Sequence, residues 1–360
     1  MYDSMKGKKI YGYDIIRALA CIMVVILHSP KPGEIAGQYG IFLSALTYLT
    51  APCIPLFFML SGALLLVPDI NPKEFIKKRF GKFIFPVIIW SFIYLFNKVV
   101  IGKITTADYF FKCVLSIPFS AQEGVLWFMY TLSGLYLLVP ILSPWLKSAS
   151  KKIVVLYLCI WSVTLCYPYL ENLLNLHTLV TAHDDIFYYF TGYVGYFVLG
   201  WFLRKYSIQS DKYYGDKRLL ILSVACLVMI FLKGIDKILH LGFDEQDGFG
   251  FQSLAVAVLS VFWWYACIAL SHKKIFNSLY VRRGINTIAK YSFGIYLSHI
   301  LIMRPWLWDC AFISNIHNYI LQTFTIIVCD FGLSLLLCVA ISYMPYSKYI
   351  IAYHQKNGAE

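Results

Sequence analysis

Long apolar segments, separated by short polar stretches rich in Lys and Arg, repeat along the whole chain. Each segment is close to the roughly 20 apolar residues that an α-helix needs to cross the hydrocarbon core of a bilayer. The pattern predicts about ten crossings, near residues 11–28, 41–67, 83–102, 124–146, 153–170, 186–203, 219–235, 250–270, 288–305 and 320–344. We therefore expect an all-α fold, a polytopic bundle of about ten transmembrane helices.

The composition supports a membrane protein and excludes several other classes. Apolar residues make up 59% of the chain and charged residues 14%, against roughly 45–50% and about 25% in soluble proteins. A soluble globule, a nucleic-acid-binding protein or a secreted disulfide scaffold would leave this apolar surface uncovered. We expect one integral-membrane domain over residues 1–360 with no soluble domain. The ten cysteines lack C-x-x-C spacing and fall mostly in apolar runs, so we interpret them as packing residues and expect no metal site.

The distribution of basic residues predicts the orientation of the chain. With the N-terminus in the cytoplasm, 23 of the 31 Lys and Arg fall on the inner side, and Arg17 lies within the membrane. The other 7 are assigned to the outer side: Lys31, Lys98, Lys103, Lys112, Lys233, Lys237 and Arg304. Because basic residues gather in cytoplasmic loops, both termini are predicted to be cytoplasmic. This asymmetry also explains the net charge of +12 without a nucleic-acid partner.

The first predicted helix carries three ionisable residues, Asp14, Arg17 and His28. At about 100° per residue, Arg17 and His28 differ by a rotation of only about 20° and lie roughly 16 Å apart along the axis. Because ionisable groups are costly in a bilayer, they normally face a protein interior or a wet cavity. The stripe therefore predicts the wall of a water-accessible cavity. The alternative is an interfacial Asp14–Arg17 pair, with His28 only ending the helix.

These residues match a known pattern: an Arg, ten intervening residues and a His in the first helix, with an Asp three residues before the Arg. A basic pair, Arg79 and Lys82, precedes the third span. Further blocks are FFMLSG (57–62), LWFMYTLSGLYLLVP (126–140), YFTGYVGYFVLGWFL (189–203) and SFGIYLSHILIM (292–303). In this order the pattern resembles the acyltransferase 3 family, the integral-membrane O-acyltransferases of bacteria.

The sequence departs from the family pattern in two respects. Lys82 replaces a second Arg, which keeps the charge but loses the bidentate guanidinium. The central block lacks a Glu-bearing motif found in many members, and no esterase-like domain is expected after the last helix. The chain therefore resembles the short, stand-alone branch of the family.

The resemblance implies an enzyme of the bacterial cytoplasmic (inner) membrane, most simply an O-acetyltransferase. Its donor would be cytoplasmic acetyl-CoA, a co-substrate used without a metal. Its acceptor would be a hydroxyl of a cell-surface saccharide or lipid-linked glycan. Histidine, with an ordinary pKa of about 6.5, suits a general base for a sugar hydroxyl.

Each implied site residue has a role in this scheme. The catalytic residues are His28, Asp14 and Arg17; the donor-binding residues are Arg17, Arg79 and Lys82; the acceptor-binding residues are Trp127, Tyr130 and His299.

Plainer interpretations remain open for several residues. Arg79 and Lys82 fit an ordinary basic loop, Trp127 and Tyr130 fit helix packing, and His299 fits a hydrogen-bonded structural role. Small residues are expected to permit close helix approach: Ser61, Gly62, Gly192, Gly195 and Gly200. The predicted outer loops carry acidic residues (Glu171, Asp184, Asp185, Asp236, Asp244, Glu245 and Asp247) and many aromatic ones (Tyr167, Tyr169, Phe187, Tyr188 and Tyr189). The aromatic residues fit an interfacial belt, and the two kinds together fit a sugar-binding surface.

Two other functions remain open, of which the first would use a polar stripe in a helix bundle and the second would need only the bundle. One is an exporter or flippase for a saccharide or small acid, and the other is a structural membrane subunit. Stabilisation by CoA would favour the acyltransferase over the exporter. The oligomeric state is left open.

Overall fold

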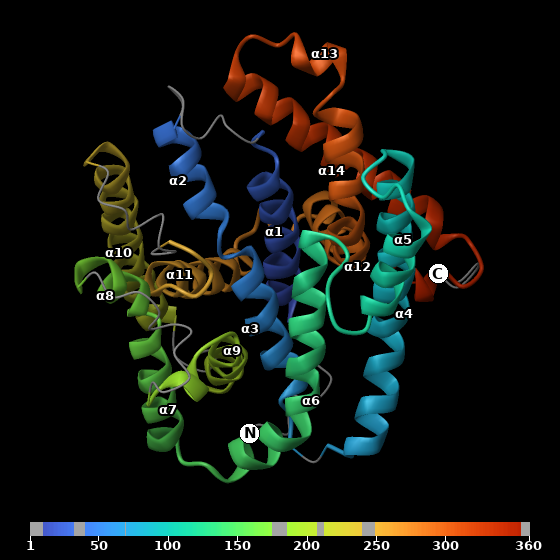
Figure 1. Cartoon of the computed structure of the whole chain (residues 1–360). Helices are drawn as coiled ribbons and strands as arrows, with labels where there is room; N and C mark the ends of the chain where they lie inside the picture. Colours follow the sequence, from blue (N-terminus) through green and yellow to red (C-terminus); the bar gives the residue numbers. More distant parts are fainter. Residues whose placement is uncertain are drawn as a thin grey trace. The chain divides into compact units, whose positions relative to one another are not determined.

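The computed structural model of the protein describes residues 10–31, 40–68, 70–174, 186–206, 212–239 and 249–353, without the side chains of 80–82, 212–216 and 237–238. Its residues form two compact units, 1–68 with 142–289 and 69–141 with 290–360. Over the described ranges every regular element is helical (Figure 1). The all-helical prediction is therefore confirmed, whereas the prediction of a single domain stays a prediction.

The first unit contains eight α-helices within its described residues. They are α1 (Tyr11–His28), α2 (Gly40–Thr50), α3 (Cys53–Leu65), α7 (Lys151–Thr164), α8 (Tyr167–Leu174), α9 (Val194–Tyr206), α10 (Lys212–Leu239) and α11 (Leu254–Leu270). Helix α1 packs against α2, α3 and α11 (Figure 1). At Gly12 an added Cβ would lie only 2.6 Å from Cδ1 of Ile268 in α11. The helix that carries the predicted site is thus enclosed within its own unit.

The second unit contains four α-helices within its described residues: α4 (Pro72–Val100), α5 (Ala107–Ser116), α13 (Ala311–Ser314) and α14 (Tyr319–Ser342). Two further helices, α6 (Trp127–Ser148) and α12 (Leu279–Ile302), have residues in both units, because the division of the chain falls within them. Short turns, Gly124–Leu126 before α6 and Met303–Leu307 after α12, extend these two helices.

Side-chain caps explain where several helices begin. The backbone N–H of Glu74 donates to the side chain of Asn71 at the start of α4, and Thr106, Ser150, Ser253 and Asn318 accept in the same way before α5, α7, α11 and α14. Asn, Ser and Thr satisfy the free N–H groups of the first turn. Helix α4 starts at Pro72, about three turns before the span predicted at 83–102, so Arg79 and Lys82 belong to the helix and not to a loop.

Seven helical segments in the described ranges are long and apolar enough to cross a membrane: 11–28, 40–65, 72–100, 124–148, 151–174, 217–236 and 319–342. The other three predicted spans are also helical. However, α9 has only 13 residues, α11 has 17, and α12 carries Arg282, Arg283 and Lys290. A multi-pass membrane protein is therefore confirmed, whereas the count of ten crossings and the cytoplasmic termini stay predictions.

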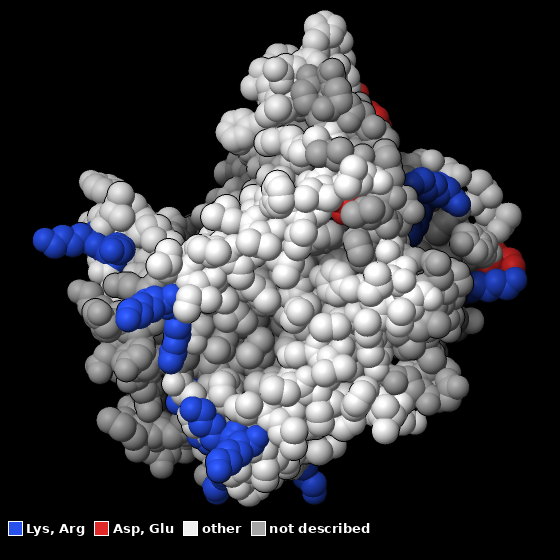
Figure 2. Space-filling view, turned by 90° about the vertical axis from the view of Figure 1, so that its left-hand side faces the viewer, with Lys and Arg blue, Asp and Glu red and all other residues white. Residues whose placement is uncertain are grey.

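Exposed apolar side chains support the membrane assignment. On α10, Leu220, Ile221, Leu227 and Phe231 are each 64–68% exposed. A soluble chain buries such residues or uses them for binding, whereas lipid covers them in a membrane protein. Figure 2 shows a face on which uncharged side chains predominate and most Lys and Arg gather towards its margins.

Glycines bring α3 and α9 into backbone contact. A Cβ added at Gly62 would lie 1.8 Å from the carbonyl oxygen of Phe197, and one at Gly200 would lie 1.8 Å from that of Met59. Gly195 lies against the ring of Trp161 in α7. Close approach is confirmed at these three positions and is wrong for Gly192, which precedes α9 with φ +86° and open space around it.

Candidate functional site

Asp14 and Arg17 form an ion pair one turn apart on α1. The distance from Nη1 of Arg17 to Oδ1 of Asp14 is 3.8 Å, and the two side chains are 33% and 11% exposed. Residues at i and i+3 share a helix face, which explains the pair from the sequence alone. At this distance the carboxylate orients the guanidinium loosely and leaves part of its surface accessible to a ligand.

His28 is the last residue of α1 and is half-buried. Its Nδ1 lies 2.8 Å from the carbonyl oxygen of Val24. A carbonyl oxygen only accepts hydrogen bonds, so Nδ1 carries the hydrogen and Nε2 carries the lone pair of the neutral ring. The imidazole is therefore held in a tautomer that can accept a proton at Nε2.

Helix α1 is continuous from Tyr11 to His28, so the predicted stripe keeps its three polar residues on one face. Between them on that face lie Cys21 and Val24, each 1% exposed. The stripe is therefore partly exposed at both polar ends and covered in the middle. A continuous cavity along α1 stays a prediction.

The basic residues predicted to bind the donor lie in the first turns of α4. Arg79 is half-buried, and Lys77 and Lys78 are exposed. Lys82 is in the helix, but its side chain lies outside the described residues. Phe83 packs edge-on against Tyr136 of α6, with ring centroids 5.1 Å apart, and thereby fixes this end of α4.

The three predicted acceptor residues lie in the second unit and are held by different neighbours. Tyr130 donates a 2.5 Å hydrogen bond to the carbonyl oxygen of Ile117. His299 is fully buried, and its Nδ1 donates to the carbonyl oxygen of Tyr296 at 2.7 Å. Trp127 is half-buried, with its ring perpendicular to that of Phe128.

The eight predicted site residues thus divide between the units. Asp14, Arg17 and His28 share one face of α1 in the first unit, and only Asp14 and Arg17 are in direct contact. Arg79, Lys82, Trp127, Tyr130 and His299 belong to the second unit. Of the acidic residues in the predicted outer loops, Asp184, Asp185, Asp244, Glu245 and Asp247 lie outside the described residues.

Sequence reasoning missed two polar features of the second unit. Asp330, in the middle of α14, is 0% exposed, and neither carboxyl oxygen has a hydrogen-bond partner among the described residues. The signal was a single acidic residue in a span of 24 residues, a feature that usually marks function. Glu123 was also missed; it lies 3.2 Å from Nζ of Lys98 and accepts a 2.9 Å hydrogen bond from Arg304.

Comparison with known proteins gives one match. A family model described as an acyltransferase domain covers residues 10–343, which include every predicted site residue. The chain matches no curated protein and no solved structure at a significant level. The matched region contains every described helix from the beginning of α1 to the end of α14. On this evidence the chain belongs to the acyltransferase 3 family, whose members are membrane acyltransferases.

Proposed function

We propose that this protein is an O-acetyltransferase of the bacterial inner membrane. It transfers an acetyl group from cytoplasmic acetyl-CoA to a hydroxyl of a cell-surface saccharide or lipid-linked glycan. The observation that carries the proposal is that Asp14, Arg17 and His28 lie on one face of α1, in a chain that belongs to the acyltransferase 3 family. The finer likeness, to the enterobacterial common antigen O-acetyltransferase, is part of the same proposal.

His28 is the proposed general base. As the acceptor oxygen attacks the thioester carbonyl carbon, Nε2 takes the hydroxyl proton. The C–S bond then breaks, and the leaving thiolate takes the proton back from the imidazolium. The products are an acetyl ester and free CoA. The hydrogen bond from Nδ1 to Val24 keeps the ring in the required tautomer throughout.

Each unit, taken by itself, carries basic residues of the kind that bind the phosphates of the donor. The partly exposed guanidinium of Arg17 and the half-buried guanidinium of Arg79 present N–H donors in the planar geometry that phosphates prefer. Lys82, with Lys77 and Lys78 on the same helix, adds charge. Asp14 orients Arg17 and balances its charge when no donor is bound.

A transfer assay tests the proposal. Membranes containing the protein should move radiolabelled acetyl from acetyl-CoA to a glycan or glycolipid fraction. His28→Ala should lower this transfer by about 10²–10⁴-fold, the usual contribution of a general base. The matched control is His272→Ala, at an exposed histidine in the turn after α11. Full transfer by His28→Ala would refute the assigned base.

Thermal stability in the presence of CoA separates this function from export. An acyltransferase should be stabilised by CoA because binding to the folded state raises the midpoint of unfolding. A saccharide or small-acid exporter should not respond to CoA. Absence of both stabilisation and transfer would reject the acetyltransferase and favour the exporter.

A further inference from the structure

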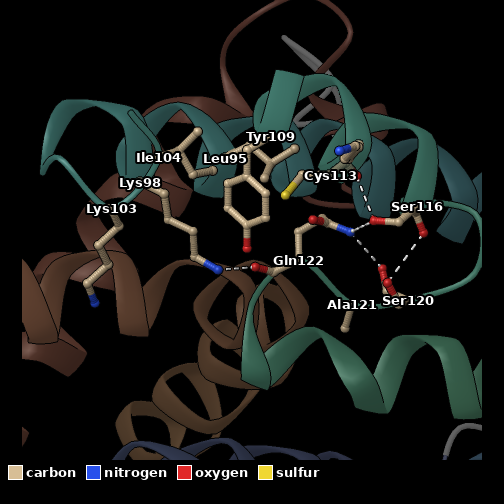
Figure 3. Close-up of a pocket in the computed structure, with 11 residues that line it drawn as sticks. Leu95, Lys98, Lys103, Ile104, Tyr109, Cys113, Ser116, Ser120, Ala121 and Gln122 are labelled. Carbon is tan, nitrogen blue, oxygen red and sulfur yellow. Dashed lines mark hydrogen bonds between the residues drawn. The ribbon is translucent and has the colours of Figure 1, made fainter. Parts of the chain in front are cut away.

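Two cavities lie side by side along helix α4 of the second unit. The first, of about 530 Å³, is polar and is lined by Lys98, Lys103 and Lys112 together with Ser116 and Gln122 (Figure 3). The second, of about 560 Å³, is apolar and is lined by residues of α4, α5 and α6, among them Ile84, Ile88, Phe92, Ile117 and Tyr130.

One face of α4 runs through both cavities. Ile84, Ile88 and Phe92 line the apolar cavity, and Leu95 and Lys98 line the polar one. Spacings of three and four residues place these side chains in one row, about 21 Å long from Ile84 to Lys98. The row therefore changes from apolar to cationic near the C-terminal end of the helix.

Helix α5 borders both cavities. Cys113 and Ser116 line the polar cavity, whereas Val114 and Ile117 line the apolar one. A cluster of Leu95, Ile104 and Ile117 fixes α5 on α4. The two cavities thus share α5 as a border, and the row on α4 runs from one cavity into the other.

The polar cavity has an excess of cations. Nζ of Lys98 donates to the carbonyl oxygen of Gln122 and lies 3.2 Å from Glu123. Lys112 lies 2.7 Å from Asp108, and Lys103 forms no ion pair with a described carboxylate. Because Arg304 also bonds to Glu123, four cations meet two carboxylates. This imbalance favours an anionic ligand.

The cavity also offers neutral hydrogen-bonding groups. The Gln122 side chain donates to Oγ of Ser116 at 2.9 Å and to the carbonyl oxygen of Ser120 at 3.0 Å. The ring of Tyr109 lies among these side chains (Figure 3). Lysine ammonium groups bind phosphates as point charges, whereas hydroxyl, amide and aromatic groups suit a sugar.

We propose that these two cavities bind the acceptor, and that the acceptor is a lipid-linked glycan phosphate. Its hydrocarbon chain lies along Ile84–Phe92, its phosphate contacts Lys98, Lys103 and Lys112, and its first sugar contacts Ser116, Gln122 and Tyr109. This inference rests on the proposed acetyltransferase function; it selects the lipid-linked glycan from the two proposed acceptors and adds the site that binds it. It also agrees with the charge distribution, which predicts that the three lysines lie on the outer side of the membrane.

Equilibrium binding of radiolabelled farnesyl phosphate to the purified full-length protein, in nanodiscs of phosphatidylcholine, tests the site. Lys103→Glu should weaken binding by about tenfold or more, the effect of losing one charged contact, and Lys103→Arg should restore it. The matched control is Lys274→Glu, at an exposed lysine of the first unit. Equal binding by Lys103→Glu and the control would overturn the proposal.

A second substitution, Gly134→Leu, tests the apolar cavity. Gly134 lines it, and a Cβ added there meets nothing within 4 Å, so Gly134→Leu should fill the cavity without disturbing the helices. It should weaken farnesyl phosphate binding at least about fivefold, the effect of excluding part of the chain. Gly234→Leu, at an equally open position of α10, should have no effect. Unchanged binding by Gly134→Leu would overturn the assignment of the chain.

Competition distinguishes the ligand classes. Farnesol and inorganic phosphate should each compete poorly because the first lacks the phosphate and the second lacks the chain. Dioleoylphosphatidylglycerol should also compete poorly, because its phosphate is a diester and its two acyl chains differ from a single isoprenoid chain. Equal competition by phosphatidylglycerol would overturn the proposal in favour of a general site for anionic lipids. Because binding is measured without transfer, loss of the site and loss of the enzyme are separable. Normal binding without acetyl transfer would refute the acetyltransferase, whereas transfer without binding would refute only this site.

Discussion

Asp14 of α1 and Asp330 of α14 are both buried acidic residues in long apolar helices, yet their surroundings differ. Asp14 has Arg17 one turn away, and this pair stays partly accessible. Asp330 is completely enclosed, and its carboxyl oxygens have no hydrogen-bond partner within the described ranges. The comparison teaches that a polar residue in a membrane helix is available for chemistry only when its charge is balanced and its surface is open.

The same contrast extends to the rest of each helix. Helix α1 ends in His28, whose Nδ1 is fixed by Val24 and whose ring is half-buried. In α14 the next polar group on the face of Asp330 is Ser334, which is also buried without a hydrogen-bond partner among the described residues. We therefore assign the reaction to α1 and expect α14 to affect mainly stability.

Among the substitutions that test this comparison, the largest loss of activity is expected at Arg17. Arg17→Ala should lower kcat/KM for acetyl-CoA by about 100-fold, because a charged hydrogen bond to the donor is lost and Asp14 loses its ion pair with Arg17. Arg17→Lys should recover part of the loss. Initial rates over a range of acetyl-CoA concentrations check this. An unchanged KM for acetyl-CoA in Arg17→Ala would remove Arg17 from donor binding.

A smaller effect is expected from the matched pair of Asp14→Asn and Asp330→Asn. Asp14→Asn should lower transfer about tenfold, because Arg17 loses the charge that orients it. Asp330→Asn should stay within about twofold of the parent, because α14 carries none of the residues of the proposed reaction. Transfer assays on equal amounts of folded protein measure both variants. A larger loss in Asp330→Asn would reverse the assignment.

Cys21 tests the covered middle of the α1 stripe. If the donor arm passes along this face, Cys21→Leu should lower transfer at saturating acetyl-CoA by about fivefold, because added volume resists the opening of a packed site. Cys21→Ala, which adds no volume, should retain the parental rate. Single-turnover rates are the measurement. Equal rates for the two variants would mean that the arm follows another route.

The long apolar helices and the Asp14–Arg17 pair could be predicted from the sequence because both depend on neighbours within one segment. Apolar length identified the long helices, whereas α5 and the short α13 lie outside the predicted spans. The spacing of three residues gave the Asp14–Arg17 pair, as the alternative to a cavity-lining stripe. The enclosure of Asp330, the link between Glu123 and Arg304, and the two cavities of α4 depend on residues far apart in the chain. The start of α4 at Pro72 was missed because its first turns are charged, although Asn71 and Pro72 together are typical of a helix start.

The smallest expected effect concerns stability and completes the comparison. Asp330→Leu should raise the free energy of unfolding by about 1–3 kcal/mol, because a buried polar group without hydrogen bonds costs about that much. Asp14→Leu should lower it, since Arg17 is then left without its carboxylate. Thermal unfolding of the purified variants in one detergent measures both. Destabilisation by Asp330→Leu that Asp330→Asn does not share would show that the carboxyl site is too tightly packed for leucine. Destabilisation by both variants would show that the carboxyl group of Asp330 itself stabilises the fold, and that α14, like α1, depends on its acidic residue.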